Sequence, residues 1–154
     1  MRNVLKPAVL MLSGALGAVA LAGPATAQFG PPPNLPDMVN HNPILYADLD
    51  DGGPGQFTGV LDPATNQLCY MINVPGMDAT AAHIHVGTAG QDGAPVVPLA
   101  TPKGGASGAC ATLKPDIAKA LVSNPAGYYV NVHTAAYPMG ATRGQLKVYD
   151  PNKK

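Results

Sequence analysis

The sequence predicts an all-β protein, a β-sandwich or Greek-key barrel with one short helix. Several short segments alternate apolar and polar residues, which is the period of a strand with one buried face. Gly and Pro are frequent, 18 and 17 of 154 residues, and they are spread along the chain. Only one segment has a convincing helical pattern. Short strands separated by Gly- and Pro-containing turns are typical of sandwiches and barrels.

The first 27 residues resemble a secretory signal peptide. Arg2 and Lys6 precede an apolar run, and Ala25-Thr26-Ala27 has the small-residue pattern of a cleavage site. We therefore expect cleavage after Ala27 and export to the periplasm or the extracellular space, with no membrane insertion afterwards. Residues 28–43 contain five prolines and form a Pro-rich leader. One domain, residues 44–150, remains.

The first strands of this domain are predicted at residues 44–49, 56–61 and 67–74. An Asp- and Gly-rich turn separates the first two, and a Pro-containing turn at residues 62–66 separates the second from the third. In the third segment Leu68, Tyr70 and Ile72 share one face. The second and third of these strands are therefore expected to form a hairpin.

The next strands are predicted at residues 81–86, 96–99 and 109–113, with a Gly-rich loop at 87–95. Residues 115–122 have Pro at the start and an acid in the first turn, as a helix N-terminus prefers, and a Pro/Gly segment ends the helix. Residues 128–134 alternate again. A single strand over residues 142–149 is predicted to close the domain.

Charge and residue inventory exclude several functions. Without Arg2 and Lys6, seven Lys and Arg remain against nine Asp, so the net charge of the exported chain is −2. No basic cluster precedes the Lys153-Lys154 tail, which argues against nucleic-acid binding. The chain has no Glu, and no Ser lies in a G-x-S-x-G turn, so we predict no catalytic residues.

The two cysteines, Cys69 and Cys110, are expected to form a disulfide. An even Cys count in an exported chain favours this pairing. The alternative is a pair of thiolate metal ligands, which the lack of a C-x-x-C spacing disfavours.

A family resemblance covers roughly residues 44–148, and its motifs lie in the second half of the chain. His83-Ile84-His85, a Gly-rich loop at 87–93, the Y-V-N-V-H-T segment at 129–134 and R-G-Q-L at 143–146 together resemble the CHRD domain family, named for chordin. The resemblance implies an immunoglobulin-like β-sandwich, and it brings no general catalytic activity. The H-x-H strand is also similar to copper-zinc superoxide dismutase, but the chain lacks that enzyme's His- and Asp-rich zinc loop.

Three of the four histidines are candidate metal ligands. His83 and His85 share a strand face by the period-2 rule, and His133 lies on the polar face of another strand. If the strands are neighbours, three imidazoles converge, and such a set binds copper or zinc. Five further residues are candidate extra ligands: His41, Asp78, Asp92, Met77 and Met139.

A polar network without metal is the alternative. Asn131, Arg143, Gln145 and Tyr129 flank the histidines in sequence or on the same strand faces, and Arg143 and Gln145 are expected to hold the loops after His85 and His133. The module would then be structural, adhesive or partner-binding. A copper redox enzyme of the dismutase type is a third possibility.

Overall fold

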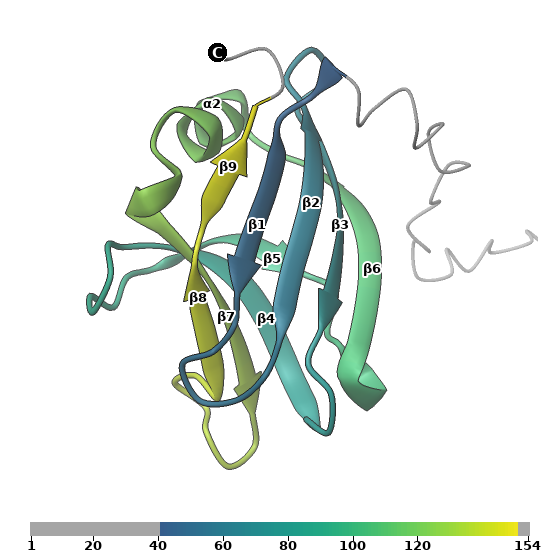
Figure 1. Ribbon diagram of the computed structural model, residues 1–154, viewed down its shortest axis with the longest axis vertical. Coiled ribbons are helices and arrows are strands. Elements are labelled where there is room, and N and C mark those ends of the chain that lie inside the picture. The colour runs from purple at the N-terminus through teal and green to yellow at the C-terminus, as the bar shows by residue number, and fades with distance from the viewer. Residues whose placement is uncertain (1–40, 151–154) are drawn as a thin grey trace, which may run out of the picture.

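The computed structural model describes residues 41–150 and forms a sandwich of two antiparallel sheets (Figure 1). One sheet has five strands in the order β6-β3-β2-β1-β9, and the other has four in the order β5-β4-β7-β8. The strands are β1 Ile44–Asp48, β2 Gln56–Asp62, β3 Gln67–Asn73, β4 Ala79–Val86, β5 Pro95–Leu99, β6 Ala106–Thr112, β7 Tyr128–Thr134, β8 Thr142–Gln145 and β9 Lys147–Tyr149. The predicted all-β sandwich is confirmed.

The core lies between the two sheets and is built by the alternation seen in the sequence. In β3 the buried positions are Leu68, Tyr70 and Ile72, as predicted. On the facing sheet Ile84 of β4 and Val130 of β7 are fully buried. Because inward-facing side chains of both sheets are apolar, burying them supplies the main stabilisation of the fold.

The disulfide between Cys69 and Cys110 is present, with an S–S distance of 2.05 Å. The two residues are directly opposite each other in the register of β3 and β6. The bridge therefore fastens the edge strand β6 to its neighbour β3, on the face of the five-stranded sheet that points away from the core.

The helix α2, Pro115–Ser123, lies near one end of the sandwich beside β9 (Figure 1). Pro115 opens it and Asp116 lies in its first turn, and Ala118 and Leu121 are its buried residues. Two short 3₁₀ turns, Lys103–Gly105 and Pro125–Gly127, precede β6 and β7. The sequence reasoning did not anticipate either turn.

The prediction of one strand over residues 142–149 was wrong. Two strands occupy this segment, and they belong to different sheets: β8 pairs with β7, and β9 pairs with β1. Leu146 lies between them with 1% of its surface exposed, and its amide donates to the Tyr128 carbonyl. Alternation continues through the junction because Leu146 still points into the core, so a local pattern cannot show the change of sheet.

Other element boundaries moved by a few residues. β4 begins at Ala79 and β6 at Ala106, earlier than predicted. Within residues 41–150 no helix is long and apolar enough to cross a membrane. The predicted signal peptide and most of the predicted leader lie outside the described residues.

Candidate metal centre

The candidate centre is built on two neighbouring strands of the four-stranded sheet. β4 and β7 pair antiparallel, with His83 opposite Asn131 and His85 opposite Tyr129. His133 is opposite Ala81, one pleat further along β7. Since Ile84 and Val130 point into the core, the alternating neighbours point outward. All three imidazoles therefore lie on the outer face of this sheet.

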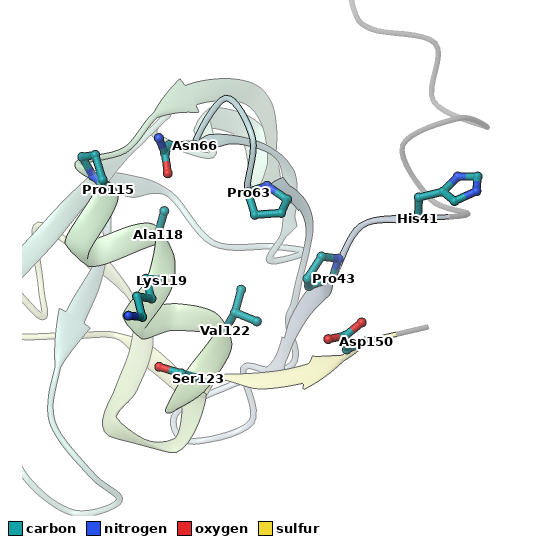
Figure 2. A pocket seen from close by; sticks show the side chains of 10 residues that line it. All are labelled: His41, Pro43, Pro63, Asn66, Pro115, Ala118, Lys119, Val122, Ser123 and Asp150. Carbon is teal, nitrogen blue, oxygen red and sulfur yellow. The ribbon is translucent and has the colours of Figure 1, made fainter. Parts of the chain in front are cut away.

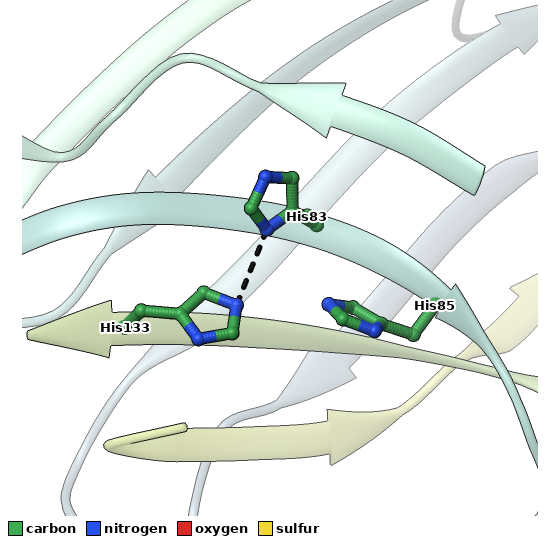
Figure 3. Close-up of side chains that lie close together, drawn as sticks. All are labelled: His83, His85 and His133. Atoms are coloured by element: carbon green, nitrogen blue, oxygen red, sulfur yellow. Dashed lines mark hydrogen bonds between the residues drawn. The ribbon is translucent and has the colours of Figure 1, made fainter. Parts of the chain in front are cut away.

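The three rings converge, as the sequence analysis expected. Ring centroids are 5.6 Å apart for His83 and His85, 5.1 Å for His83 and His133, and 5.7 Å for His85 and His133. One nitrogen from each ring lies within 4.8 Å of the others. The dashed line in Figure 3 joins His83 Nδ1 and His133 Nε2, which lie 3.2 Å apart.

These separations are close to what one ion requires. Nitrogen ligands about 2.0–2.1 Å from a tetrahedral ion stand roughly 3.4 Å apart. The His83–His133 pair already has this spacing, at 3.2 Å. A displacement of the His85 nitrogen by about an ångström would bring it to the same spacing. Side-chain rotation within ordinary rotamer adjustment can supply this displacement.

Backbone carbonyls determine which nitrogen two of the rings, His85 and His133, present to the centre. His85 Nδ1 lies 2.8 Å from the Gly93 carbonyl, and His133 Nδ1 lies 3.0 Å from the Pro138 carbonyl. A carbonyl can only accept, so both Nδ1 atoms donate. In the neutral rings the Nε2 atoms then carry lone pairs directed at the centre.

His85 Nε2 is buried and has no hydrogen-bond partner in the described part of the chain. The His85 residue is 8% exposed, and the Tyr129 ring stacks on it at 5.1 Å with an interplanar angle of 19°. Buried polar atoms almost always have a partner. An acceptor lone pair left alone beside two other imidazoles is the condition that a bound cation would satisfy.

Two loops cover the outer face of β7, which is buried on both sides along most of its length. The first loop follows β4 at residues 87–94, and the second follows β7 at residues 135–141. Gly93 is fixed at both ends: its carbonyl accepts from His85, and its amide donates to the Tyr129 hydroxyl at 3.1 Å. A Cβ at Gly93 would lie 1.7 Å from the Val86 carbonyl oxygen, so the position requires glycine.

Arg143 and Gln145 hold the first loop. Arg143 donates to the Asp92 carboxylate and to the Gln91 carbonyl, both at 2.9 Å, while its guanidinium carbon lies 3.6 Å from the centre of the Tyr129 ring. Gln145 Nε2 donates to the Gly87 carbonyl at 2.9 Å and also lies 2.7 and 2.6 Å from two carbonyls just before and at the start of β7.

The second loop is held differently from the expectation. Within residues 41–150, the side chains of Arg143 and Gln145 form no hydrogen bond to this loop. Instead, Asn131 Nδ2 donates to the Met139 carbonyl at 3.0 Å. Asn131 is 4% exposed. Its short side chain, between Tyr129 and His133 on β7, reaches the turn that the longer side chains on β8 do not.

The environment favours the neutral forms of His83 and His133. Burial lowers the pKa of His83, and the neighbouring His133 and His85 lower it further. Burial also lowers the pKa of His133, against the opposing effect of its bond to the Pro138 carbonyl. Because only the neutral imidazole can bind a metal, these shifts favour binding at neutral pH.

Of the other candidate ligands, His41, Asp78 and Asp92 do not belong to this cluster. The group of metal-capable side chains in residues 41–150 contains only the three histidines. Asp92 pairs with Arg143 at 2.9 Å. His41, near the start of β1, lines a cavity of about 500 Å³ with Pro43, Pro63 and residues of α2 (Figure 2).

Sequence reasoning missed the groups that orient the rings. The Gly93 and Pro138 carbonyls belong to the backbone, so no side-chain motif reveals them. The only local signal was the glycine at position 93, one of several in the loop.

No curated protein and no solved structure matches the chain significantly. The sequence profile of the CHRD domain matches residues 43–146, which span all of the strands except β9. The chain therefore belongs to the CHRD domain family.

Proposed function

We propose that this CHRD domain is an exported module that binds one transition metal ion, copper or zinc, through His83, His85 and His133. The observation that carries the proposal is the buried His85 Nε2, which has no partner in the described chain and lies in the cluster with the other two imidazoles. A lone pair in this state costs about 1–3 kcal/mol as long as it stays unpaired. Coordination removes that cost.

The residues around the histidines support the proposal. Metal-binding histidines usually donate their other ring nitrogen to a carbonyl or a carboxylate, which fixes the tautomer. His85 and His133 both do so. We assign Tyr129, Asn131, Arg143 and Gln145 the role of holding the rings and the two loops in place. The disulfide is compatible with export to an oxidising compartment, periplasmic or extracellular.

A module without metal is the second candidate, and one contact favours it. The His83–His133 contact at 3.2 Å is a satisfied hydrogen bond in the absence of an ion. The histidines would then order the two loops for adhesion or for a protein partner. This alternative does not explain why His85 Nε2 is buried with no hydrogen-bond partner in the described chain.

Metal analysis of the purified chain, produced without a His tag, separates the two candidates. We expect one equivalent of zinc or copper after loading and dialysis, and none in the variant with His83, His85 and His133 all changed to Ala. His41→Ala is the matched control and should keep the full equivalent. If wild type and triple variant retain equal metal, the proposal fails. Circular dichroism must show that the triple variant is folded.

A further inference from the structure

We infer that the ion is monovalent copper, and that the thioether of Met139 captures it at the rim of the centre. This inference rests on the three-histidine site proposed above. Two separate observations support it. The first is the charge of the ligand set, and the second is the position of Met139.

The ligand set carries no negative charge. In the described chain the cluster holds three imidazoles and no carboxylate or thiolate. The Arg143 guanidinium lies over the Tyr129 ring that stacks on His85. Its partner, Asp92, has a side chain that is 91% exposed. A bound ion would therefore keep its full charge in a largely buried place.

This arrangement favours a monocation over a dication. The cost of moving an ion out of water grows with the square of its charge, so a divalent ion costs about four times as much as a monovalent one of similar size. Zinc held by three histidines commonly offsets its charge by ionising a bound water. Here His85 Nε2 is out of contact with solvent. Cu(I) accepts three neutral nitrogen ligands and needs no bound water.

Met139 lies on the turn that His133 holds. The Pro138 carbonyl accepts from His133, and the Met139 carbonyl accepts from Asn131, both at 3.0 Å. The turn is closed by hydrogen bonds between Thr134, Tyr137 and Gly140. Its backbone is thus tied to the centre at two consecutive carbonyls.

The Met139 side chain takes no part in the core. It is 84% exposed, the highest value among the large hydrophobic residues of the described chain. Packing therefore does not account for a methionine at this place. A thioether is a soft ligand that prefers Cu(I) to zinc. A fixed turn that is bonded to His133 and presents such a ligand to solvent is suited to taking Cu(I) from a soluble donor.

The transfer is a ligand exchange. A sulfur lone pair of Met139 forms a bond to copper as a donor ligand leaves, and imidazole lone pairs then replace the sulfur. Copper remains Cu(I), so no oxidant or reductant is needed. The proton on the His83 nitrogen that binds copper moves, through water, to the other ring nitrogen, so the imidazole stays neutral.

The test supplies Cu(I) as its bicinchoninate complex, without oxygen, to the full chain produced without a His tag. Loss of the complex's colour in a stopped-flow instrument gives the transfer rate, and the final absorbance gives the affinity. We expect Met139→Leu to slow transfer roughly tenfold, as for loss of a single supporting ligand. Its zinc affinity, measured by chelator competition, should be unchanged.

Met71→Leu is the matched control, because Met71 is 70% exposed on the other sheet. It should transfer copper at the wild-type rate. If Met139→Leu also does so, the role of Met139 is wrong. If wild type binds zinc but takes no copper from the complex, the assignment of Cu(I) is wrong while the metal site stands. If wild type binds neither ion, the proposed function itself fails.

Discussion

At the scale of single residues, His85 separates the metal-binding interpretation from a purely structural one. A structural histidine finds partners for both ring nitrogens or exposes one to water. His85 bonds Gly93 through Nδ1 and keeps Nε2 buried and unpaired in the described structure. His133 is also buried and bonded to a carbonyl through Nδ1, but its Nε2 forms a hydrogen bond with His83.

Metal should therefore stabilise the folded chain, since only the folded state assembles the three rings. At a free ion concentration one hundred times the dissociation constant, the gain in unfolding free energy is about 2.7 kcal/mol. Urea unfolding with and without zinc or Cu(I) measures it. We expect almost no gain for His85→Gln and the full gain for His41→Gln. An equal gain in both variants would contradict the role of His85.

The lowered pKa values of His83 and His133 make the metal-free protein less stable in mild acid. Their unfolded pKa is near 6.5. Below that pH the unfolded chain takes up protons that the folded chain resists, so stability is complete above about pH 6.5 and falls as the pH decreases. Asp62, whose pKa is lowered from 3.8, acts only at a more acidic pH.

Urea unfolding of the metal-free chain between pH 7.5 and 5 should show this loss, and NMR titration of the imidazole signals should give midpoints below 6.5 for both histidines. Changing His83 and His133 to Gln should flatten the pH dependence. Normal midpoints in the wild type would show that burial does not oppose their protonation.

At the scale of elements, the sequence predicts what local period determines. Alternation places His83 and His85 on one face of β4, and it places Leu68, Tyr70 and Ile72 together on one face of β3. Both assignments are confirmed. The alternation of apolar and polar residues within one strand does not indicate which other strand it pairs with. That β7 pairs with β4, and that residues 142–149 divide between two sheets at Leu146, depends on contacts between distant segments.

The first loop is the element that couples Arg143 to the centre. Arg143 packs its guanidinium on the Tyr129 ring, and its bonds go to Asp92 and to the Gln91 carbonyl, while Gly93 bonds His85. Removing them should loosen the loop and misplace the His85 ring.

We therefore expect Arg143→Met to weaken metal binding about 10–100-fold, as is usual for groups that orient ligands. Competition with a chromophoric chelator measures the change. Lys147→Met is the matched control, because Lys147 also forms an exposed 2.9 Å salt bridge, with Asp48, on the five-stranded sheet. Should both variants bind equally well, the loop would not position His85.

At the scale of the whole molecule, the disulfide and the candidate centre lie on different sheets. Cys69 and Cys110 join β3 and β6 of one sheet, while the three histidines belong to β4 and β7 of the other. The apolar core separates the two sheets. The outer face of one sheet carries the disulfide, and the outer face of the other carries the candidate centre. We therefore expect changes at these two faces to affect the unfolding free energy and the metal affinity independently.

Replacing both cysteines with Ala tests this independence. The native bridge closes a loop with a sequence separation of 41 residues. Chain entropy gives it about 4 kcal/mol of stabilisation, by restricting the unfolded state. We expect the double variant to lose about that much unfolding free energy in urea, while its metal affinity, measured below the unfolding transition, stays at the wild-type value. Because the bridge acts on the unfolded chain, the folded positions of His83, His85 and His133 do not depend on it. Adding reductant should destabilise only the wild type. A fall in affinity in the still-folded double variant would show that the two sheets are coupled through the core.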